Sequence, residues 1–423
     1  MNIVYLCTDF GIPVHGNKGA SIHVRELSAA LASQGRQVDI ISCRAGGDPP
    51  VGFHVPVHEF PVEKSERVLV GSLQDDPAAS EPMAKEVRSM LYAATLRHRV
   101  MPLLQRLRPD AIYERYSLLG AAGVELARLL DIPHILEVNA PLSDEHATHR
   151  GIGFSQTIRA TEQRVLGAAD QVIAVSEPLR QWIAGGGVDA ERISVVPNGV
   201  DIDRFASPNG DVRTRLGLDD RPVVGFVGTL KAWHGTATLI QAVARLVSER
   251  GMDRAPRLLI VGDGPQRLHL EQLAADEGVT AITTFTGMVD HADIPRYIAA
   301  MDIAVAPYNI TPDFYFSPLK LFEYMAAGRP VVAAGIGQIG ECIRNAETGL
   351  LYPPGDVSEL TNRIAWLLDD PANARAMGLA AQQEVMAHRS WSQNARVVIE
   401  LIERKRAPQR QRVTSASRME ESH

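Results

Sequence analysis

The chain of 423 residues is long enough for two domains with sizeable cores, and its 45% hydrophobic and 22% charged residues are ordinary for a globular protein. A net charge of −7 argues against a protein that coats nucleic acid. The sequence has no basic leader with a cleavage site and no apolar run of membrane-spanning length, so we expect a cytoplasmic protein. Three scattered cysteines, with Cys7 in a predicted core strand, favour buried free thiols over a disulfide or a metal site.

Predicted strands and helices alternate along the chain, which indicates an α/β protein with two doubly wound, Rossmann-like halves. The first half is expected over residues 1–200, with an amphipathic helix at Ser21–Gln34. An acidic loop at Asp75–Glu81 precedes a long helix at Pro82–Arg106. The strands expected in this half are Asn2–Cys7, Gln37–Ser42, Phe53–Phe60, Ala111–Tyr116, His134–Val138, Gln171–Ser176 and Arg192–Pro197.

The second half is expected over residues 201–390 and begins with a polar linker at 201–220. The polar tail at 405–423 has no apolar period and is predicted to be disordered. Ligands of such sheets bind at the carboxyl ends of the strands, where every glycine-rich loop of this half falls. The strands expected here are Val223–Val227, Leu258–Val261, Ile282–Thr286, Ile303–Pro307, Val331–Ala333 and Leu350–Tyr352, and the last helices are Asp356–Leu368, Ala372–His388 and Trp391–Arg404.

The most informative stretch, residues 308–332, joins one predicted strand to the next through a short helix. Ser317 is expected to cap this helix and Pro318 to occupy its first position. The unpaired N–H groups of a helix start attract anions, above all phosphate. Lys320 in the first turn is unfavourable unless an anion lies nearby, and Glu323 on the same face could accept hydrogen bonds from a ribose. The alternative is an ordinary crossover helix with a snorkelling Lys320 and a surface Glu323.

Three glycine-rich loops follow predicted strands of the second half. The loop Gly228–Gly235 lets the backbone approach a phosphate closely, and Lys231 adds a charge. The loop Val261–Pro265 is a tight turn around Gly262. The loop Phe285–Val289 presents backbone groups that could read the edge of a nucleobase. Each loop by itself also fits a plain turn between a strand and a helix.

Together these motifs resemble glycosyltransferase family 4, whose members have the GT-B fold of two Rossmann-like domains facing a cleft. The resemblance implies a nucleotide-sugar donor bound mainly by the second domain and an acceptor bound mainly by the first. It also implies transfer with retention at the anomeric carbon, without a metal ion or cofactor, and a late helix, 391–404, that packs back on the first domain. The matching segments, within about residues 1–390, are VIAVSE, VVPNGVD, a strand ending in Gly228, VGDGP, FTGMV, SPLKLFEYMAAGRPVVA and ETGLLYPPGD.

The resemblance assigns donor-binding roles by motif position. Glu323 is expected to hold the ribose hydroxyls. The N–H groups of Leu319, Lys320 and Leu321 are expected to face the diphosphate. The other donor-site candidates are Gly19, Gly228, Thr229, His234, Gly262, Ser317 and Pro318, together with Met288 and Val289 at the base.

The sequence departs from the family pattern at two places. The family often has Glu-x₇-Glu, whose first glutamate contacts the sugar. Here Tyr315 stands at that position, and Asp313 is the nearest carboxylate that could replace the glutamate. The first glycine-rich loop usually provides an Arg and a Lys for the diphosphate, and those positions hold Thr229 and His234. The departures leave the donor sugar open.

Three residues are expected to act in catalysis. Lys231 and Lys320 are the local cations left to stabilise the leaving diphosphate. Asn139 follows a first-half strand at a position where many relatives have a His that points toward the sugar. Asn139 can form hydrogen bonds but cannot act as a base. We therefore expect front-face transfer, in which the departing phosphate oxygen takes the acceptor's proton and no protein nucleophile is needed.

Three further first-half residues are candidates for acceptor binding. Lys18 lies in a glycine-rich loop before the first helix, for which a mobile surface loop is the rival interpretation. Glu114 ends a strand, and a structural ion pair with an Arg is the slightly favoured alternative. His146 lies in a polar loop that could simply be solvated. The basic residues of the helix at 82–106 could face a membrane surface, but interspersed glutamates favour an ordinary solvated face.

The sequence therefore predicts a retaining, metal-independent glycosyltransferase that uses a UDP-sugar in preference to GDP-mannose or other donors. Its acceptor could be a small molecule, a glycan or a lipid-linked sugar, and no nucleic acid is expected as a partner. A phosphorylase or a nucleotide-sugar epimerase on the same fold is one alternative. A non-catalytic nucleotide-sugar-binding partner is another, suggested by Tyr315, Thr229 and His234.

Overall fold

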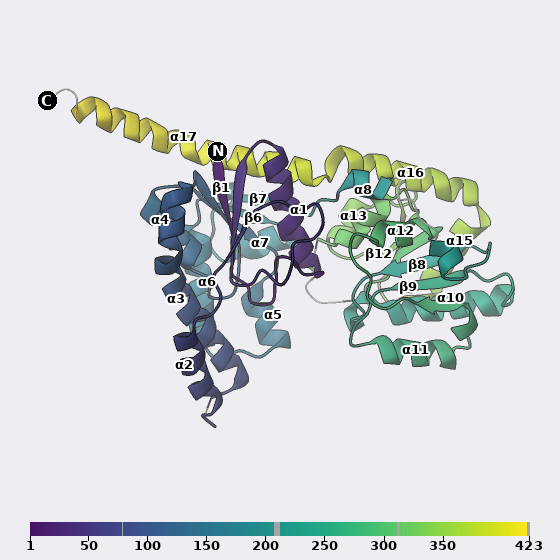
Figure 1. Cartoon of the computed structure of the whole chain (residues 1–423). Coiled ribbons are helices and arrows are strands. Elements are labelled where there is room, and N and C mark those ends of the chain that lie inside the picture. Colours follow the sequence, from purple (N-terminus) through teal and green to yellow (C-terminus); the bar gives the residue numbers. More distant parts are fainter. Residues whose placement is uncertain (78, 207–211, 311–313, 316, 421–423) are drawn as a thin grey trace. The chain divides into compact units, whose positions relative to one another are not determined.

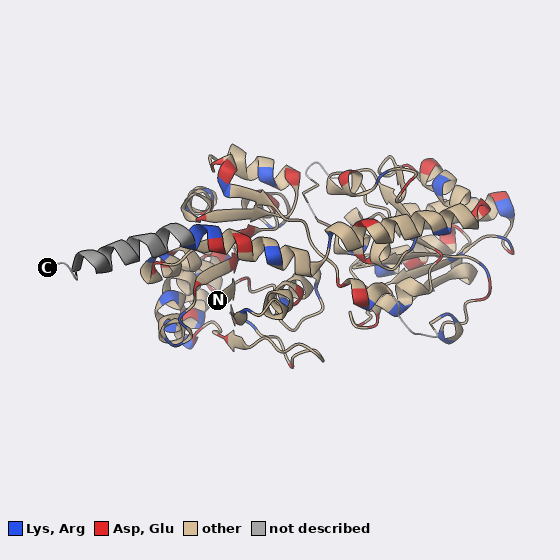
Figure 2. Cartoon of the chain, turned by 90° about the horizontal axis from the view of Figure 1, so that it is seen from above, with Lys and Arg blue, Asp and Glu red and all other residues tan. Residues whose placement is uncertain are grey.

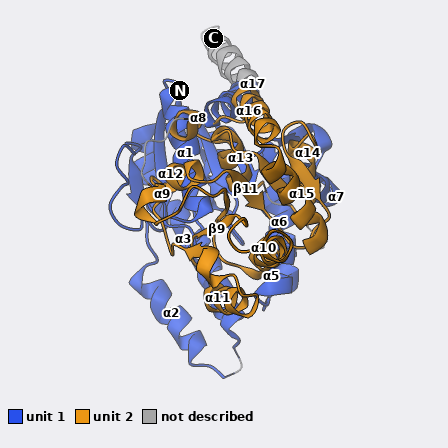
Figure 3. Ribbon diagram, turned by 90° about the vertical axis from the view of Figure 1, so that its right-hand side faces the viewer, with its two compact units in different colours: residues 1–197, 391–423 blue, residues 198–390 orange. Residues whose placement is uncertain are grey.

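The computed structural model describes residues 1–77, 79–206, 212–310, 314–315 and 317–420, with side chains through residue 406. The chain divides into two compact units, coloured separately in Figure 3. Unit 1 is Met1–Pro197 together with the chain from Trp391, and unit 2 is Asn198–Ser390. Each unit is built on a parallel sheet flanked by helices (Figure 1), so the predicted doubly wound α/β fold is confirmed.

In the described part of unit 1, the sheet has seven parallel strands in the order β3-β2-β1-β4-β5-β6-β7. In the register of β1, Val4 lies opposite Asp39 on one side and Ile112 on the other. Most strand residues are buried because helices cover the sheet. The strands are β1 (Asn2–Cys7), β2 (Gln37–Ser42), β3 (Val57–Glu59), β4 (Ala111–Arg115), β5 (His134–Val138), β6 (Gln171–Ala174) and β7 (Ile193–Val195).

The longest helix that covers this sheet, α3, starts at a Ser80 cap, whose hydroxyl accepts a hydrogen bond from the N–H of Met83. Tyr92, Leu96 and Val100 of α3 belong to a buried cluster with residues of β1, β2 and β4. The helices are α1 (Gly19–Ser33), α2 (Lys64–Gln74), α3 (Glu81–Leu107), α4 (Ala122–Leu130), α5 (Leu142–His149), α6 (Ser155–Ala168), α7 (Glu177–Gly185), η1 (Ala190–Arg192) and α17 (Trp391–Glu420).

The sheet of unit 2 has, in its described part, six parallel strands in the order β10-β9-β8-β11-β12-β13. These are β8 (Val223–Val227), β9 (Arg257–Val261), β10 (Thr283–Phe285), β11 (Ile303–Ala306), β12 (Val331–Ala334) and β13 (Leu350–Tyr352). The helices are α8 (Ile202–Ala206), α9 (Val212–Arg215), η2 (Ala232–His234), α10 (Thr236–Arg250), α11 (Arg267–Asp276), η3 (Thr280–Ile282), α12 (Ile294–Ala299), α13 (Leu319–Ala326), α14 (Gln338–Cys342), α15 (Val357–Asp369) and α16 (Pro371–His388).

Two expectations about the elements need correction. The strand expected over 53–60 is shorter and covers only the residues of β3. Pro56, just before β3, has no N–H group to donate to a neighbouring strand. The expected linker contains α8 and α9, and Phe205 and Val212 of these helices are buried in the core of unit 2. The helix expected at 391–404 continues in α17 as far as Glu420, and the disorder expected for the tail at 405–423 stays a prediction.

The C-terminal helix α17 contacts the rest of unit 1 at its first turns. The ring of Trp391 lies 4.9 Å from that of His23, and Ser392 accepts a hydrogen bond of 2.8 Å from Gln34. Further along, Arg36 pairs with Glu403 at 3.3 Å. The chain thus leaves unit 2 after α16 and completes unit 1, although α17 is far from α1 in the sequence (Figure 1).

In each sheet the strand order reverses at one point. In unit 1 this switch point lies between β1 and β4, and in unit 2 it lies between β8 and β11. Loops leave in opposite directions at a switch point, which opens a crevice at the carboxyl ends of the two strands. Ligand sites are therefore expected after Cys7 and Arg115 in unit 1, and after Val227 and Ala306 in unit 2.

Charged residues of both signs are interspersed over the two units (Figure 2). Cys7, Cys43 and Cys342 are buried free thiols, as predicted. Within the described residues, we find no helix that is both long enough and apolar enough to cross a bilayer.

Candidate functional site

The switch point of unit 2 is a place of close backbone approach. Gly228, directly after β8, has a φ of 148°, and a Cβ there would lie 2.6 Å from Nζ of Lys320. A Cβ on Gly262, after β9, would lie 2.2 Å from the carbonyl oxygen of Gly228. Gly235 has a φ of 67°, and its Cβ would lie 1.7 Å from the carbonyl oxygen of Pro307. Only glycine fits these positions, so the loops after β8, β9 and β11 are held together.

Helix α13 starts at this place, with Pro318 in the cap position. The prediction that Ser317 caps the helix is wrong, because its hydroxyl accepts a hydrogen bond of 2.9 Å from the N–H of Asn198. Nδ2 of Asn198 also donates to the carbonyl oxygen of Ser317 at 2.6 Å. The N–H of Leu321 already donates to the carbonyl oxygen of Pro318 at 3.1 Å. For the N–H groups of the first two helix residues, the described part of the chain provides no such partner.

The ammonium group of Lys320 is enclosed in this crevice. Its Nζ lies 4.1 Å from the ring centroid of Phe226 and 5.1 Å from that of Tyr308, in cation–π contact. Among the described residues Nζ has no hydrogen-bond partner. Burial lowers the pKa of Lys320 to about 7, against the opposing effect of Glu323. The snorkelling alternative is therefore wrong, since the ammonium points into the protein rather than to water.

Glu323, one turn further along α13, is also buried, so the alternative of a surface carboxylate is wrong. Its Oε1 lies 3.1 Å from Nε2 of His291, and Nδ1 of His291 lies 3.3 Å from Nη1 of Arg204. A guanidinium can only donate, so Nδ1 accepts and Nε2–H donates to Glu323. Arg204 is held in turn by Asp201 at 3.1 Å. This chain of contacts fixes the orientation of the Glu323 carboxylate.

The loop after β8 carries one neutral and one charged side chain. Nδ1–H of His234 donates to the carbonyl oxygen of Thr229, and burial together with the charge of Lys320 lowers the pKa of His234 to about 3. His234 is therefore neutral at physiological pH and cannot supply the positive charge that the family pattern leads us to expect at this position. Nζ of Lys231 lies 4.5 Å over the exposed ring of Trp233.

Two side chains in the segment after β10 were expected to contact the nucleobase, and only one of them is exposed. Met288 is 75% exposed, whereas Val289 packs against the core of unit 2. The preceding Gly287 accepts a hydrogen bond of 3.0 Å from the N–H of Gly262, which ties this segment to the loop after β9. Asp313, the suggested replacement for the missing glutamate, lies outside the described residues.

In unit 1, Asn139 is held by a buried carboxylate. Glu137 is 2% exposed, and its Oε1 accepts hydrogen bonds of 2.5 Å from Asn139 and 2.9 Å from Arg115. Its Oε2 accepts from Tyr113 and, at 2.7 Å, from His23. Burial alone would raise the pKa of Glu137, but His23 and Arg115 lower it to about 2. The amide group of Asn139 is thereby fixed at the carboxyl end of β5.

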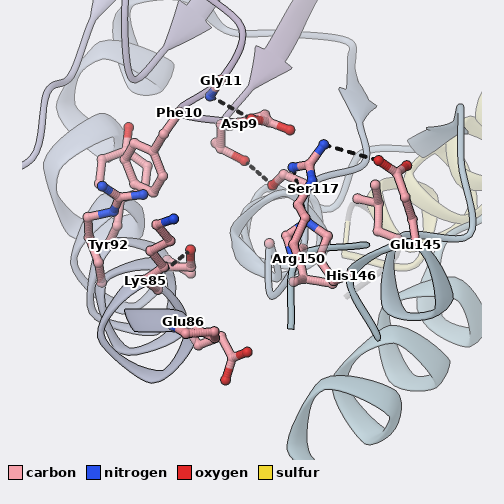
Figure 4. A pocket seen from close by; sticks show the side chains of 18 of the residues that line it. Asp9, Phe10, Gly11, Lys85, Glu86, Tyr92, Ser117, Glu145, His146 and Arg150 are labelled. Atoms are coloured by element: carbon pink, nitrogen blue, oxygen red, sulfur yellow. Dashed lines mark hydrogen bonds and ion pairs between the residues drawn. The ribbon is translucent and has the colours of Figure 1, made fainter. Parts of the chain in front are cut away.

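The acceptor-site candidates of unit 1 lie in different environments. Glu114 is fully buried and pairs with His134 at 2.8 Å, not with an Arg, so it is not placed to contact an acceptor. Lys18 is exposed, and its Nζ donates to the carbonyl oxygen of Gly11 at 3.0 Å. Gly19 is the exposed first residue of α1. His146, on α5, lines a cavity at the switch point of unit 1 (Figure 4).

Sequence reasoning found Lys320 and Glu323 because both lie inside a motif with clear helix punctuation. It missed His291, which lies 32 residues before Glu323, the side chain that it holds. It also missed the role of Glu137, which lies 2 residues before Asn139 and holds that side chain. A signal for Glu137 was present, since a glutamate in the predicted core strand at 134–138 must have buried partners. No local signal could have paired His291 with Glu323.

Known proteins match the chain in both sequence and structure. Family models described as Glycosyltransferase Family 4 and Glycosyl transferases group 1 match residues 17–204 and 221–370. Glycogen synthase of Mycobacterium tuberculosis is 29% identical over 399 residues, covering 92% of each chain. The 2-deoxystreptamine glucosyltransferase of Streptomyces kanamyceticus is 32% identical over 278 residues, which are 64% of this chain and 68% of that protein. This chain belongs to glycosyltransferase family 4.

The fold of this family 4 member also matches solved structures. The structure of Anabaena HepE in complex with UDP-glucose superposes with a TM-score of 0.69 at 22% identity, covering 95% of this chain and 99% of that one. The match confirms the α/β architecture of the family 4 enzyme, a glycosyltransferase. At this identity the match concerns the fold alone.

Proposed function

We propose that this glycosyltransferase moves a sugar from a nucleotide-sugar donor, a UDP-sugar in preference to others, to a hydroxyl group of an acceptor with retention of the anomeric configuration. The observation that carries the proposal is the enclosed ammonium group of Lys320. A buried cation without a hydrogen-bond partner is costly, and the N–H groups at the start of α13 lie in the same turn. A bound diphosphate would accept hydrogen bonds both from the ammonium group of Lys320 and from the N–H groups at the start of α13.

The same place offers a ribose site. The carboxylate of Glu323 lies one helical turn after the start of α13, and His291 holds it in one orientation. A carboxylate can accept hydrogen bonds from both ribose hydroxyls. The exposed Met288 is then the side chain available to cover the base. The choice of uridine is the expectation from the sequence, and Anabaena HepE, a protein with the same fold, has been solved in complex with UDP-glucose.

The proposed reaction needs no protein nucleophile. The bond between the anomeric carbon and the donor phosphate oxygen breaks, and a bond from the acceptor oxygen forms on the same face of the sugar. The acceptor proton passes to the departing phosphate oxygen. Lys320, Lys231 and the N–H groups at the start of α13 would stabilise the charge that grows on the diphosphate. Asn139, fixed by Glu137, would orient the sugar or the acceptor by hydrogen bonds.

The direct test is a thermal-shift series with UDP, GDP and ADP, followed by turnover with the matching nucleotide sugars. A ligand that binds only the native state raises Tm, so UDP should give the largest increase. The product should be a glycoside with the anomeric configuration of the donor, as observed by NMR. Release of sugar phosphate without nucleotide would indicate a phosphorylase, and absence of any turnover would favour a binding protein.

Replacing Glu323 by glutamine should weaken the binding of UDP about tenfold or more. Hydrogen bonds to a charged group are worth roughly 1.5–3 kcal/mol, and the amide keeps only one acceptor oxygen. Calorimetry on Glu323→Gln measures the loss. Glu249→Gln is the matched control, because Glu249 forms only a surface pair with Arg245 at 3.1 Å in the same unit. Equal affinities of the two variants would remove Glu323 from the ribose site.

Activity is expected to survive EDTA. In the described part of the chain, no three His, Cys, Asp or Glu residues are grouped so that they could hold a metal ion. The proposed charge stabilisation therefore rests on lysines and backbone N–H groups. The measurement is the initial rate before and after chelation. A loss of rate that Mn²⁺ or Mg²⁺ restores would contradict this assignment.

A further inference from the structure

Helix α8 lies beside α13, the helix that carries Glu323 (Figure 1). The segment that leads into α8 begins at Asn198, the first residue of unit 2, which donates two hydrogen bonds to Ser317, just before α13. Arg204 of α8 lies further along, with its Nη1 3.3 Å from Nδ1 of His291. The first residues of unit 2 therefore contact both the start of α13 and the side chain that holds its carboxylate.

The side chain of Arg204 starts from a well-anchored backbone. The N–H of Val200 donates to the carbonyl oxygen of Arg389 at 2.8 Å, and Phe205, next to Arg204, is buried in the core of unit 2. The guanidinium also pairs with Asp201 at 3.1 Å. A group can orient another side chain only if its own position is fixed by packing and by partners. Arg204 meets this condition.

His291 connects Arg204 to Glu323. Only 14% of its side chain is exposed, and its ring lies 6.4 Å from that of Phe205. Because a guanidinium can only donate, Nδ1 of His291 accepts, and the ring proton is on Nε2, which lies 3.1 Å from Oε1 of Glu323. No hydrogen bond to Oε2 of Glu323 is found among the described residues, so this oxygen can accept from a ligand.

Recognition of a ribose depends on where the two oxygens of the carboxylate point. The last torsion of a glutamate side chain has a broad minimum, so a carboxylate without a partner rotates. His291 removes this freedom by holding Oε1, and a pre-oriented acceptor costs less ordering when the ligand binds. If His291 served only to satisfy a buried carboxylate, its loss would weaken the binding of every nucleotide by the same factor.

We propose that Arg204 and His291 are positioning residues that orient Glu323 toward the hydroxyl groups of a ribose. They thereby give the donor site a preference for ribonucleotides over deoxyribonucleotides. The inference rests on the proposed function for the presence of a ribose at Glu323. It adds that the selectivity for the ribose is set by two side chains that act through this carboxylate.

The test measures the dissociation constants of UDP, 2′-deoxy-UDP and 3′-deoxy-UDP by calorimetry on the full chain. The ribose preference is defined as the ratio of the dissociation constant of the weaker deoxy analogue to that of UDP. In the wild type it should be about tenfold or more, which corresponds to one hydrogen bond to a charged group. In Glu323→Gln it should be smaller, since the amide keeps only one acceptor oxygen.

His291→Leu should reduce the ribose preference to about threefold or less, because the carboxylate is no longer held. Arg204→Met should reduce it by about twofold or more, since Nδ1 of His291 loses the donor that fixes its tautomer. His291→Gln should keep most of it, because a glutamine amide can still donate to Glu323. In the Glu323→Gln background, His291→Leu should have no further effect on the ratio, since the carboxylate through which it acts is gone.

The matched controls are His269→Leu and Arg245→Met in the same unit. His269 is exposed on α11, and Arg245 forms a surface pair with Glu249. Melting curves check that all variants fold. The proposal would be overturned if the wild type showed no ribose preference, or if His291→Leu weakened all three nucleotides equally and left the ratio unchanged. Failure of UDP to bind at all would contradict the proposed donor together with this inference, so the two failures are distinguishable.

Discussion

Replacing Lys320 by methionine should lower kcat by about 10²–10³, the usual cost of removing one donor from a developing oxyanion. The same change should raise the Tm of the ligand-free protein. Its Nζ is enclosed without a hydrogen-bond partner, so methionine keeps the packing and removes the cost of a buried charge. A gain of about 1 kcal/mol would shift Tm by roughly 2–4 °C in a domain of this size. A site built for an anion should show this opposition between stability and activity.

The control for this experiment is Lys231→Met in the neighbouring loop. Lys231 is half-exposed and stacked on Trp233, so its loss should lower kcat less and leave Tm nearly unchanged. The measurements are steady-state kinetics and melting curves for both variants. Wild-type turnover by Lys320→Met would mean that another cation meets the diphosphate charge. Lys231 and Lys18 would then be the next candidates.

If Lys320 faces the diphosphate as proposed, nucleotide binding should depend on pH with a defined sign. Its pKa of about 7 in the free protein means that the ammonium loses its proton as the pH rises through 7, whereas a bound diphosphate favours the charged form. Binding above pH 7 therefore takes up a proton, and affinity falls toward pH 9. The unfolded chain holds this proton up to about pH 10, so the group's penalty on stability shrinks between pH 7 and 10. Lys320→Met should remove both effects.

The alternating pattern predicted most of the fold because parallel strands are long apolar runs bounded by glycine and proline. It failed where tertiary contacts decide the structure. The apparently polar linker contains two short helices, because Phe205 of one and Val212 of the other are buried in the core of unit 2. Helix α2 was missed, although Glu63 and Glu66 form a capping box at its start.

The candidate site was likewise predicted from the sequence only in part. Lys320 was found because a cation in the first turn of a helix contradicts a local rule. Its enclosure against Phe226, however, depends on a contact between residues 94 positions apart, which no local pattern encodes.

Replacing Glu137 by glutamine should produce the largest loss of stability of any conservative change in unit 1. The substitution keeps the shape but leaves the guanidinium of Arg115, which is 8% exposed, without its counter-charge. Breaking a buried pair in this way costs roughly 3–5 kcal/mol, or about 6–20 °C in Tm. Glu191→Gln, an exposed site in the same unit, is the matched control and should change Tm by less than about 1–2 °C.

The pH dependence of this loss identifies its cause. The pKa of Glu137 is lowered in the folded protein to about 2, from an ordinary value of 4.5. Its contribution to stability is therefore complete above about pH 4.5 and disappears as the pH falls toward 2. The difference in Tm between wild type and Glu137→Gln should narrow over that window. If packing alone were responsible, the difference would stay constant with pH. Binding of UDP, assigned to unit 2, should be unchanged in the folded variant, while transfer should fall because Asn139 loses the carboxylate that holds it.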